Sequence, residues 1–197
     1  VSYNQEIGEL IQIIVPELTN EMICESIKMF GTSYQNIYTR LALIFNFNKD
    51  KLKEILQRLK FDNKTIKNVI DTHELIYKFR NRKFIDSPKY CIKLILNKNE
   101  NVIESVIDGI RCTSQLDINK DYYSFANILT ECLEECKKEC FKLSHLKING
   151  NDIKSMGFQK EEVGKILNFL LDCNFKNLVE NNHDKLIEFC KNTFKKK

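Results

Sequence analysis

The stretch KDKLKEILQRLKFDNKTIKNVIDTHELIYKF (residues 49–79) decides the fold class of this chain. Its apolar residues recur at intervals of three and four, which is the period of an amphipathic helix rather than the alternation of a strand. The spacing predicts two helices, over about 49–59 and 63–79, joined by a short turn. Their apolar positions are Leu52, Ile55, Leu56 and Leu59 in the first, and Ile66, Val69, Ile70, Leu75 and Ile76 in the second.

The same helical period extends toward both ends of the chain. Only two prolines and six glycines interrupt it, and no segment has a convincing strand pattern. Pro16 is expected to end the first helix, and Asn20 to cap the second. The sequence therefore predicts an all-α fold. The further helices are expected over about 7–14, 22–30, 34–46, 88–96, 99–112, 119–142 and 183–194, with a short helix after Asn149 and another that starts near Lys160.

Length and composition limit the class of protein. A chain of 197 residues can bury a sufficient core without disulfides or a structural metal, and no apolar run reaches the 18 or so residues of a membrane span. Eight scattered cysteines indicate reduced thiols, which predicts a cytoplasmic location. The opening residues lack the features of a signal peptide, so we interpret Val1 as a boundary within a longer protein.

The polar stretch from Ser144 to Gly150 is the best candidate for a domain boundary. It predicts a multi-helix body over residues 1–143 and a small helical tail over 144–197. Net charge is only +4, with 31 basic against 27 acidic residues, so any nucleic-acid surface must come from local clusters.

One such cluster lies between His73 and Lys93, where basic and aromatic residues alternate. This pattern is typical of a surface that follows a phosphate backbone. It is equally typical of a helix end whose aromatic side chains lie in the core and whose charges are solvated. The residues are Tyr77, Lys78, Phe79, Arg80, Arg82, Lys83, Phe84, Lys89, Tyr90 and Lys93.

A second candidate is a predicted helical hairpin after residue 148. Asn149 and Asp152 have the spacing of a capping box, and Gly157 can adopt the left-handed turn between two helices. The start of the second helix would present N–H groups to a phosphate. The alternative is a plain hairpin, in which Glu161 and Glu162 supply the anion internally.

Catalytic and metal-binding patterns are weak. Cys132, Cys136 and Cys140 recur every four residues and would span about 12 Å along one helix, too far for a single zinc ion. His183-Asp184 is similar to a metal-hydrolase ligand pair but has no further aspartate after it. We predict no catalytic and no metal-binding residues in this chain.

Three stretches together resemble the C-terminal half of the class II CCA-adding tRNA nucleotidyltransferases and their poly(A) polymerase relatives. The first, GELIQIIVPEL (8–18), is similar to the end of the family's neck domain. The second, RLALIF (40–45) followed by LKFDNK (59–64), is similar to segments of its body domain. The third and most specific, LKINGNDIKSMGFQKEEVGKIL (146–167), is similar to its tail motif.

The resemblance implies an all-helical region that holds the acceptor stem and elbow of tRNA. Addition of nucleotides from CTP and ATP, with Mg²⁺ ions, would belong to a head domain whose motifs are absent from these residues. The parent would be a transferase, and this chain alone non-catalytic. The alternative is a helical protein-interaction module unrelated to RNA. The predicted RNA contacts are Lys60, Asn63, Lys64, Arg80, Arg82, Lys83, Gly150, Gly157, Lys160, Gly164 and Lys165.

Overall fold

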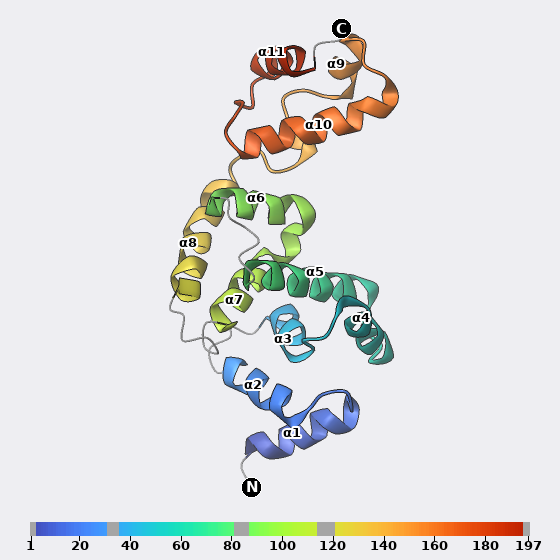
Figure 1. The fold of residues 1–197 in the computed structure, drawn as a ribbon, viewed down its shortest axis with the longest axis vertical. Helices are drawn as coiled ribbons and strands as arrows, with labels where there is room; N and C mark the ends of the chain where they lie inside the picture. The colour runs from blue at the N-terminus through green and yellow to red at the C-terminus, as the bar shows by residue number, and fades with distance from the viewer. Residues whose placement is uncertain (1–2, 31–35, 81–86, 114–120, 195–197) are drawn as a thin grey trace. The chain divides into compact units, whose positions relative to one another are not determined.

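The computed structural model describes residues 3–30, 36–80, 87–113 and 121–194, and all regular secondary structure in these ranges is helical (Figure 1). The predicted all-α fold is confirmed. The chain divides into two compact units, here called unit 1 (within residues 1–85 and 99–130) and unit 2 (within 86–98 and 131–197). No described helix is long and apolar enough to cross a membrane.

Unit 1 is built mainly from the N-terminal half of the chain. α8 begins in this unit and ends in unit 2. The elements of unit 1 are α1 (Tyr3–Ile14), α2 (Asn20–Phe30), α3 (Ile37–Ile44), α4 (Lys49–Arg58), α5 (Asn63–Arg80), the 3₁₀ turn η1 (Glu100–Val102), α7 (Ile103–Thr113) and the first part of α8 (Asp121–Cys136).

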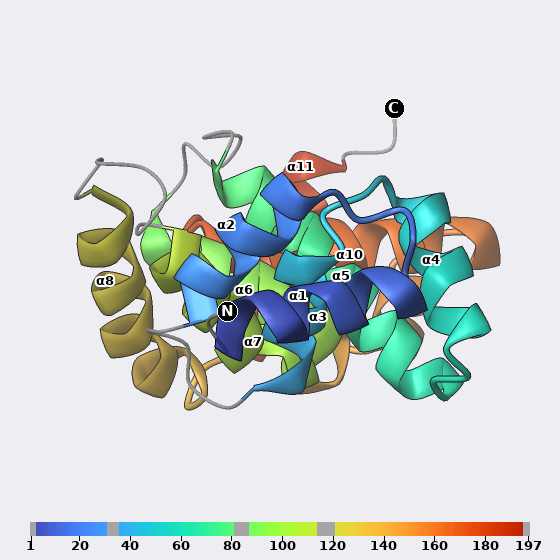
Figure 2. The same ribbon diagram turned by 90° about the horizontal axis from the view of Figure 1, so that it is seen from below.

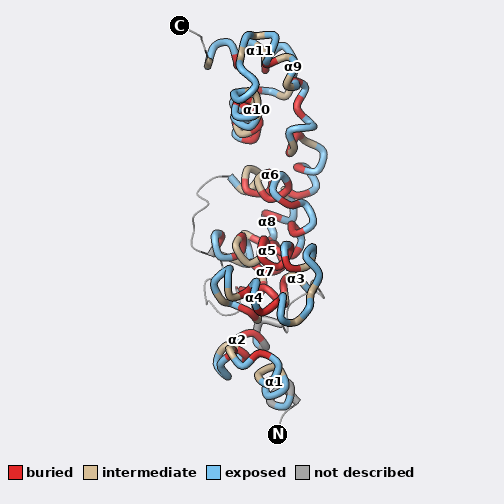
Figure 3. Tube along the Cα trace, turned by 90° about the vertical axis from the view of Figure 1, so that its right-hand side faces the viewer, coloured by how far each residue is buried: buried red, intermediate tan, exposed pale blue. Residues whose placement is uncertain are grey.

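The centre of unit 1 is α5, which packs against α3, α4 and α7. Buried residues gather on these helices, while α1 is largely exposed (Figure 3). α1 lies beside α2 in both ribbon views (Figures 1 and 2). At the crossing of α5 and α7, a Cβ atom on Gly109 would overlap Cδ1 of Ile76 and lie 2.8 Å from its Cγ1. A larger residue here would therefore force the Ile76 side chain or the two helices to shift.

Buried hydrogen bonds fix the same helices to one another. Thr39 Oγ1 on α3 donates to the carbonyl of Ser105 on α7 at 2.9 Å. Asn99 Nδ2 donates to Asn68 Oδ1 at 2.9 Å and to Asp71 Oδ2 at 2.8 Å, which joins the start of η1 to α5. Because a buried polar group left without its partner costs about 1–3 kcal/mol, these bonds select one register of the helices.

Unit 2 holds the remaining helices. Tyr90 Oη on α6 donates to Asp172 Oδ1 on α10 at 2.8 Å, so α6 belongs with the C-terminal helices. The boundary predicted between residues 143 and 144 lies inside this unit. The elements are α6 (Pro88–Asn99), the end of α8, the 3₁₀ turn η2 (Leu143–His145), α9 (Gly150–Ser155), α10 (Lys160–Phe175) and α11 (His183–Thr193).

Several predicted helix boundaries differ from the structure, and two of these differences change the role expected of a named residue. Thr19, not Asn20, caps α2, because its Oγ1 accepts a hydrogen bond from the N–H of Met22 at 3.2 Å. α8 ends at Cys136 rather than near residue 142, so Cys140 lies beyond the helix that was expected to carry it. The segment after Cys136 is held instead by ion pairs between Glu139 and lysines of α6.

Lys93 is a buried cation in unit 2, with a side chain only 2% exposed. Its Nζ lies 2.7 Å from Glu139 Oε2, and the other oxygen of this carboxylate lies 2.5 Å from Lys89 Nζ. Burial acts to raise the pKa of Glu139, but the hydrogen bonds from Lys89 and Lys93 outweigh it and hold this pKa below its ordinary value. The carboxylate therefore stays charged and compensates both lysines.

The two partners of this pair should differ in their effect on stability. Glu139→Gln leaves the buried ammonium of Lys93 without a carboxylate and should lower the free energy of unfolding by about 2 kcal/mol, since Glu139 is partly exposed. Lys93→Met removes the buried charge and leaves Glu139 paired with Lys89, so the loss should stay below about 1 kcal/mol. Urea denaturation of both variants tests this, and the opposite order would contradict it.

Candidate nucleic-acid interface

The predicted RNA contacts do not form a single patch. In unit 1, Lys60 lies in the turn before α5 and Asn63 and Lys64 in its first turn, whereas Arg80 is its last residue. An 18-residue helix separates these two groups by roughly 26 Å. Arg82 and Lys83 lie outside the described residues, and only the backbone of Arg80 is described. The predicted contacts of unit 2 lie on the α9–α10 hairpin and the first turns of α10.

The turn between α4 and α5 presents its lysines to solvent. Lys60, Asn63 and Lys64 are all exposed. Asp62 Oδ1 accepts hydrogen bonds from the N–H groups of Lys64 at 2.9 Å and Thr65 at 3.0 Å. The hydrogen bond from the Thr65 side chain, supported by these N–H groups, lowers the pKa of Asp62. The backbone at the start of α5 is thus already capped by a carboxylate, and the lysine side chains are the groups offered to an anion.

Lys60 has a left-handed backbone, with φ of 59°. The N–H of Phe61 donates to the carbonyl of Leu56 at 3.1 Å and that of Lys60 to Gln57 at 2.9 Å, as in a Schellman motif. Glycine is the usual residue at this position because a side chain in this conformation costs roughly 1–2 kcal/mol. An exposed lysine here gives the turn no packing advantage, which is consistent with a role for its charge.

The aromatic residues of the basic cluster divide between core and surface. Phe79 is buried and its ring centroid lies 5.7 Å from that of Phe125. Tyr90 is half-buried and bonded to Asp172, and Lys93 is buried against Glu139. These residues therefore follow the alternative in which the pattern reflects packing. Tyr77 differs, because 56% of it is exposed.

The α9–α10 hairpin is built by residues of the 146–167 motif. The N–H of Asn149 donates to Asp152 Oδ2 at 2.8 Å, which confirms the predicted capping box. Gly157 has φ of 87°, which confirms the predicted left-handed turn. A Cβ atom on Gly150 would lie 3.2 Å from Cγ1 of Val163, so the two helices approach closely at this glycine. Gly150 and Gly157 thus have structural roles within the hairpin.

The start of α10 supplies its own anion. The N–H of Gln159 donates to Glu162 Oε2 at 2.7 Å. This carboxylate occupies the position that a phosphate would take at the helix N-terminus. The arrangement favours the plain-hairpin alternative for these N–H groups.

Gly164, by contrast, has no packing role. It is an exposed residue inside α10, and no heavy atom would lie within 4 Å of a Cβ atom placed on it. Glycine in a helix interior costs roughly 0.5–1 kcal/mol relative to alanine. Lys160 and Lys165 are exposed beside it, and Glu161 also lies on this part of the helix. The result is a strip of helix without a side chain at Gly164, flanked by two lysines, in which the Gly164 carbonyl accepts a hydrogen bond from Asn168 Nδ2 at 2.7 Å.

Lys154 was not among the predicted contacts. It lies exposed on α9, inside the same motif as Gly150 and Gly157.

His183 joins the starts of α9 and α11. Its Nδ1 lies 3.0 Å from Asp184 Oδ1 and its Nε2 lies 3.8 Å from Asp152 Oδ1. The hydrogen bond with Asp184 and the charge of Asp152 raise the pKa of this imidazole. Among the residues that the structure describes, no group of three or more His, Cys, Asp or Glu side chains is arranged to hold a metal ion.

Comparison with known proteins identifies no relative: no family model, no curated protein and no solved structure matches this chain.

Replacing Lys60 by glycine should distinguish the backbone strain at this residue from a role of its charge in binding. Lys60→Gly relieves the left-handed lysine and should raise the free energy of unfolding by up to about 1 kcal/mol, while it removes one cation from the α4–α5 turn. Lys53→Gly, in the interior of α4, should instead lower stability by roughly 1 kcal/mol. Thermal denaturation compares the two, and a loss of stability in Lys60→Gly would show that the side chain has a structural role.

Proposed function

We propose that this chain binds tRNA, as the C-terminal region of a CCA-adding nucleotidyltransferase whose catalytic head lies elsewhere in the parent protein. The proposal is supported by the resemblance of three stretches to that family, in the same order along the chain. The most specific stretch, residues 146–167, forms a capped helical hairpin in unit 2.

The observation that carries the proposal is Gly164. Neither a turn nor a close helix contact requires glycine at this position. By contrast, Gly157 forms a left-handed turn and Gly150 allows two helices to approach closely. Glycine is also used where a ligand must approach the backbone closely. With Lys160 and Lys165 beside it, the strip suits the sugar-phosphate backbone of RNA, which lysines attract by charge.

In this proposal the chain positions tRNA and performs no chemistry itself. Duplex RNA is recognised by its shape and backbone, because side chains cannot read its deep, narrow major groove. Exposed lysines beside Gly164 on α10 would provide contacts of that kind. CTP, ATP and Mg²⁺ would act only at the head, and the parent would be a cytoplasmic transferase.

The second candidate function is a helical protein-interaction module, and α1 is the observation that favours it. One face of α1, with the buried Gly8, packs toward α2, and Val15 directly after the helix is also buried. The other face exposes Leu10, Ile13 and Ile14 at 59%, 75% and 58%. An apolar face of this kind marks a protein contact. If α1 is the last helix of a neck domain, its exposed apolar face would pack against the rest of the parent protein. The exposed face is therefore compatible with both functions.

The relative affinity of the chain for two RNAs tests the proposal against the protein-interaction module. The chain should bind an unmodified tRNA transcript more tightly than an unstructured single strand of equal length, because backbone and shape determine the contact. Electrophoretic mobility shift at one fixed salt concentration measures both. Equal affinity for the two RNAs, or no affinity for either, would support the protein-interaction module.

Gly164→Ala should make the chain more stable and a weaker binder. The added methyl group meets no protein atom, so helix propensity should raise the free energy of unfolding by roughly 0.5–1 kcal/mol. The same methyl group obstructs the approach of RNA and should weaken tRNA binding several-fold. Asn192→Ala on α11 is the matched control, since it also raises helix propensity but should leave binding unchanged. If the two variants bind tRNA with equal affinity, Gly164 no longer supports the proposal.

Lys165 should contribute one phosphate contact. Lys165→Ala should flatten the slope of log K against log salt by roughly 0.7–0.9, because one fewer counterion is released on binding. The control is Lys191→Ala, which removes an exposed lysine from α11 of the same unit. If both variants change the slope equally, attraction to RNA is diffuse and is not localised at α10.

A further inference from the structure

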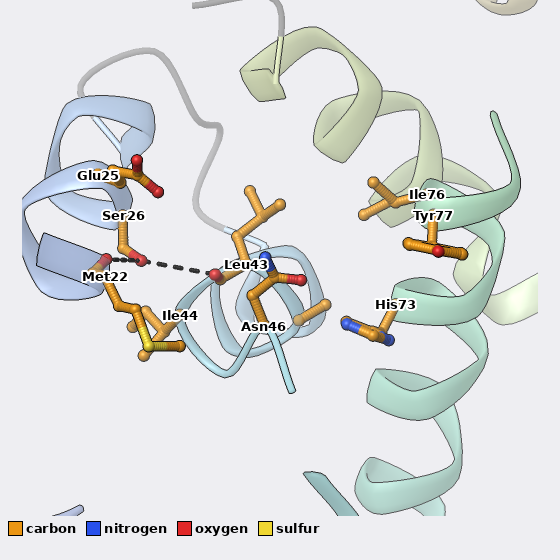
Figure 4. A pocket seen from close by; sticks show the side chains of 10 residues that line it. Met22, Glu25, Ser26, Leu43, Ile44, Asn46, His73, Ile76 and Tyr77 are labelled. Carbon is orange, nitrogen blue, oxygen red and sulfur yellow. Dashed lines mark hydrogen bonds between the residues drawn. The ribbon is translucent and has the colours of Figure 1, made fainter. Parts of the chain in front are cut away.

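Unit 1 contains a groove between the α3–α4 loop and one face of α5. Its volume is about 670 Å³, which is within the range of ligand pockets. Asn46, Phe47 and Lys49 line one side, and His73, Tyr77 and Lys78 line the other. The groove shares Asn46, His73 and Tyr77 with a narrower pocket of about 100 Å³ that reaches α2 at Met22 and Ser26 (Figure 4).

Two aromatic side chains line the groove. Tyr77 is 56% exposed although it lies on the central helix of the unit, and Phe47 on the opposite side is half-buried. An exposed tyrosine face provides a stacking platform for a flat ring.

Two polar side chains lie at the inner end of the groove. His73 Nε2 is buried and has no hydrogen-bond partner. Burial lowers the pKa of His73 although the charge of Glu74 opposes this shift, so the ring is neutral at pH 7 and has one donor and one acceptor nitrogen. The exposed amide of Asn46, toward which His73 points in Figure 4, likewise donates and accepts. Ser26 is already engaged, since its Oγ donates to the carbonyl of Met22 at 2.8 Å.

The rim of the groove carries positive charge. Lys78 is exposed on α5, and Lys49 Nζ lies 2.8 Å from Glu74 Oε1. Glu74 therefore compensates Lys49, which Asp71 and Asp50 also influence by charge, and Lys78 supplies the rim with an exposed cation. This charge suits a phosphate group at the edge of the groove.

We propose that this groove receives one unstacked nucleobase of the bound RNA. The inference rests on the proposed RNA-binding function and adds to it a site that reads an unpaired base. The base would stack on Tyr77, its edge would meet Asn46 and His73, and its phosphate would lie near Lys78. Single-stranded RNA is recognised by this combination of aromatic stacking and edge hydrogen bonds.

A peptide side chain fits the groove less well. An apolar anchor would leave Asn46 and the buried His73 Nε2 without partners, and an unsatisfied buried polar atom is unfavourable. A base edge carries donors and acceptors side by side, which matches an amide and a neutral imidazole.

Substitution of Tyr77 tests the site with two RNA probes. One probe is an unmodified tRNA transcript, and the other is a fully paired RNA duplex without unpaired nucleotides. Tyr77→Ala should weaken tRNA binding by roughly 5- to 150-fold, as expected for the loss of one stacked base, and should leave duplex binding unchanged. Tyr77→Phe keeps the ring and should bind both probes like the unmodified chain. Tyr77 is exposed, so neither change should affect folding.

The matched control is Tyr123→Ala, which removes another exposed tyrosine of unit 1, on α8 away from the groove. It should leave tRNA binding unchanged. Unchanged tRNA affinity in Tyr77→Ala, or an equal loss for the paired duplex, would overturn the base site while RNA binding stands. Failure of the unmodified chain to bind either RNA would overturn the RNA-binding proposal and the base site with it.

Discussion

The close approach of α7 to α5 at Gly109 is the constraint on which unit 1 depends. Because glycine leaves room for the Ile76 side chain, the two helices pack closely here, and a larger residue would force Ile76 or the helices to shift. The buried hydrogen bonds of Thr39 and Asn99 then fix the register of α3, α5 and α7 around the crossing. The face of α5 that does not pack against α3 and α7 carries the groove residues His73, Tyr77 and Lys78.

Unit 2 is organised by a different interaction, in which charge is buried. Lys93 is buried and its Nζ pairs with Glu139, which Lys89 also contacts. The pair holds the segment after α8 against α6, and Tyr90 ties α6 to α10. Two lysines of the basic cluster are thus used for folding. This explains why the density of basic residues in a sequence does not measure the charge that a surface offers to RNA.

Residues of the same type among the candidate RNA contacts have different structural roles. Gly157 serves a turn and Gly150 a close helix approach, whereas Gly164 serves neither. The carboxylates of Asp62 and Glu162 already occupy two helix starts. The described surface therefore has a set of exposed lysines, a strip of helix without a side chain at Gly164 and a groove with an exposed tyrosine. In the proposed function, each of these would contact the backbone or a base of the RNA.

The sequence by itself determined the local features of this protein. The three-and-four spacing of apolar residues predicted the helices, and short-range chemistry predicted the capping box at Asn149 and the turn at Gly157. These features depend on residues within one or two turns of each other, so a linear pattern contains them. Tertiary structure alone decided that α6 belongs to unit 2, that Lys93 is buried, and that Asn46 and His73 share a groove. These depend on contacts between residues far apart in the chain, where the partner that determines burial or pairing cannot be read from local spacing.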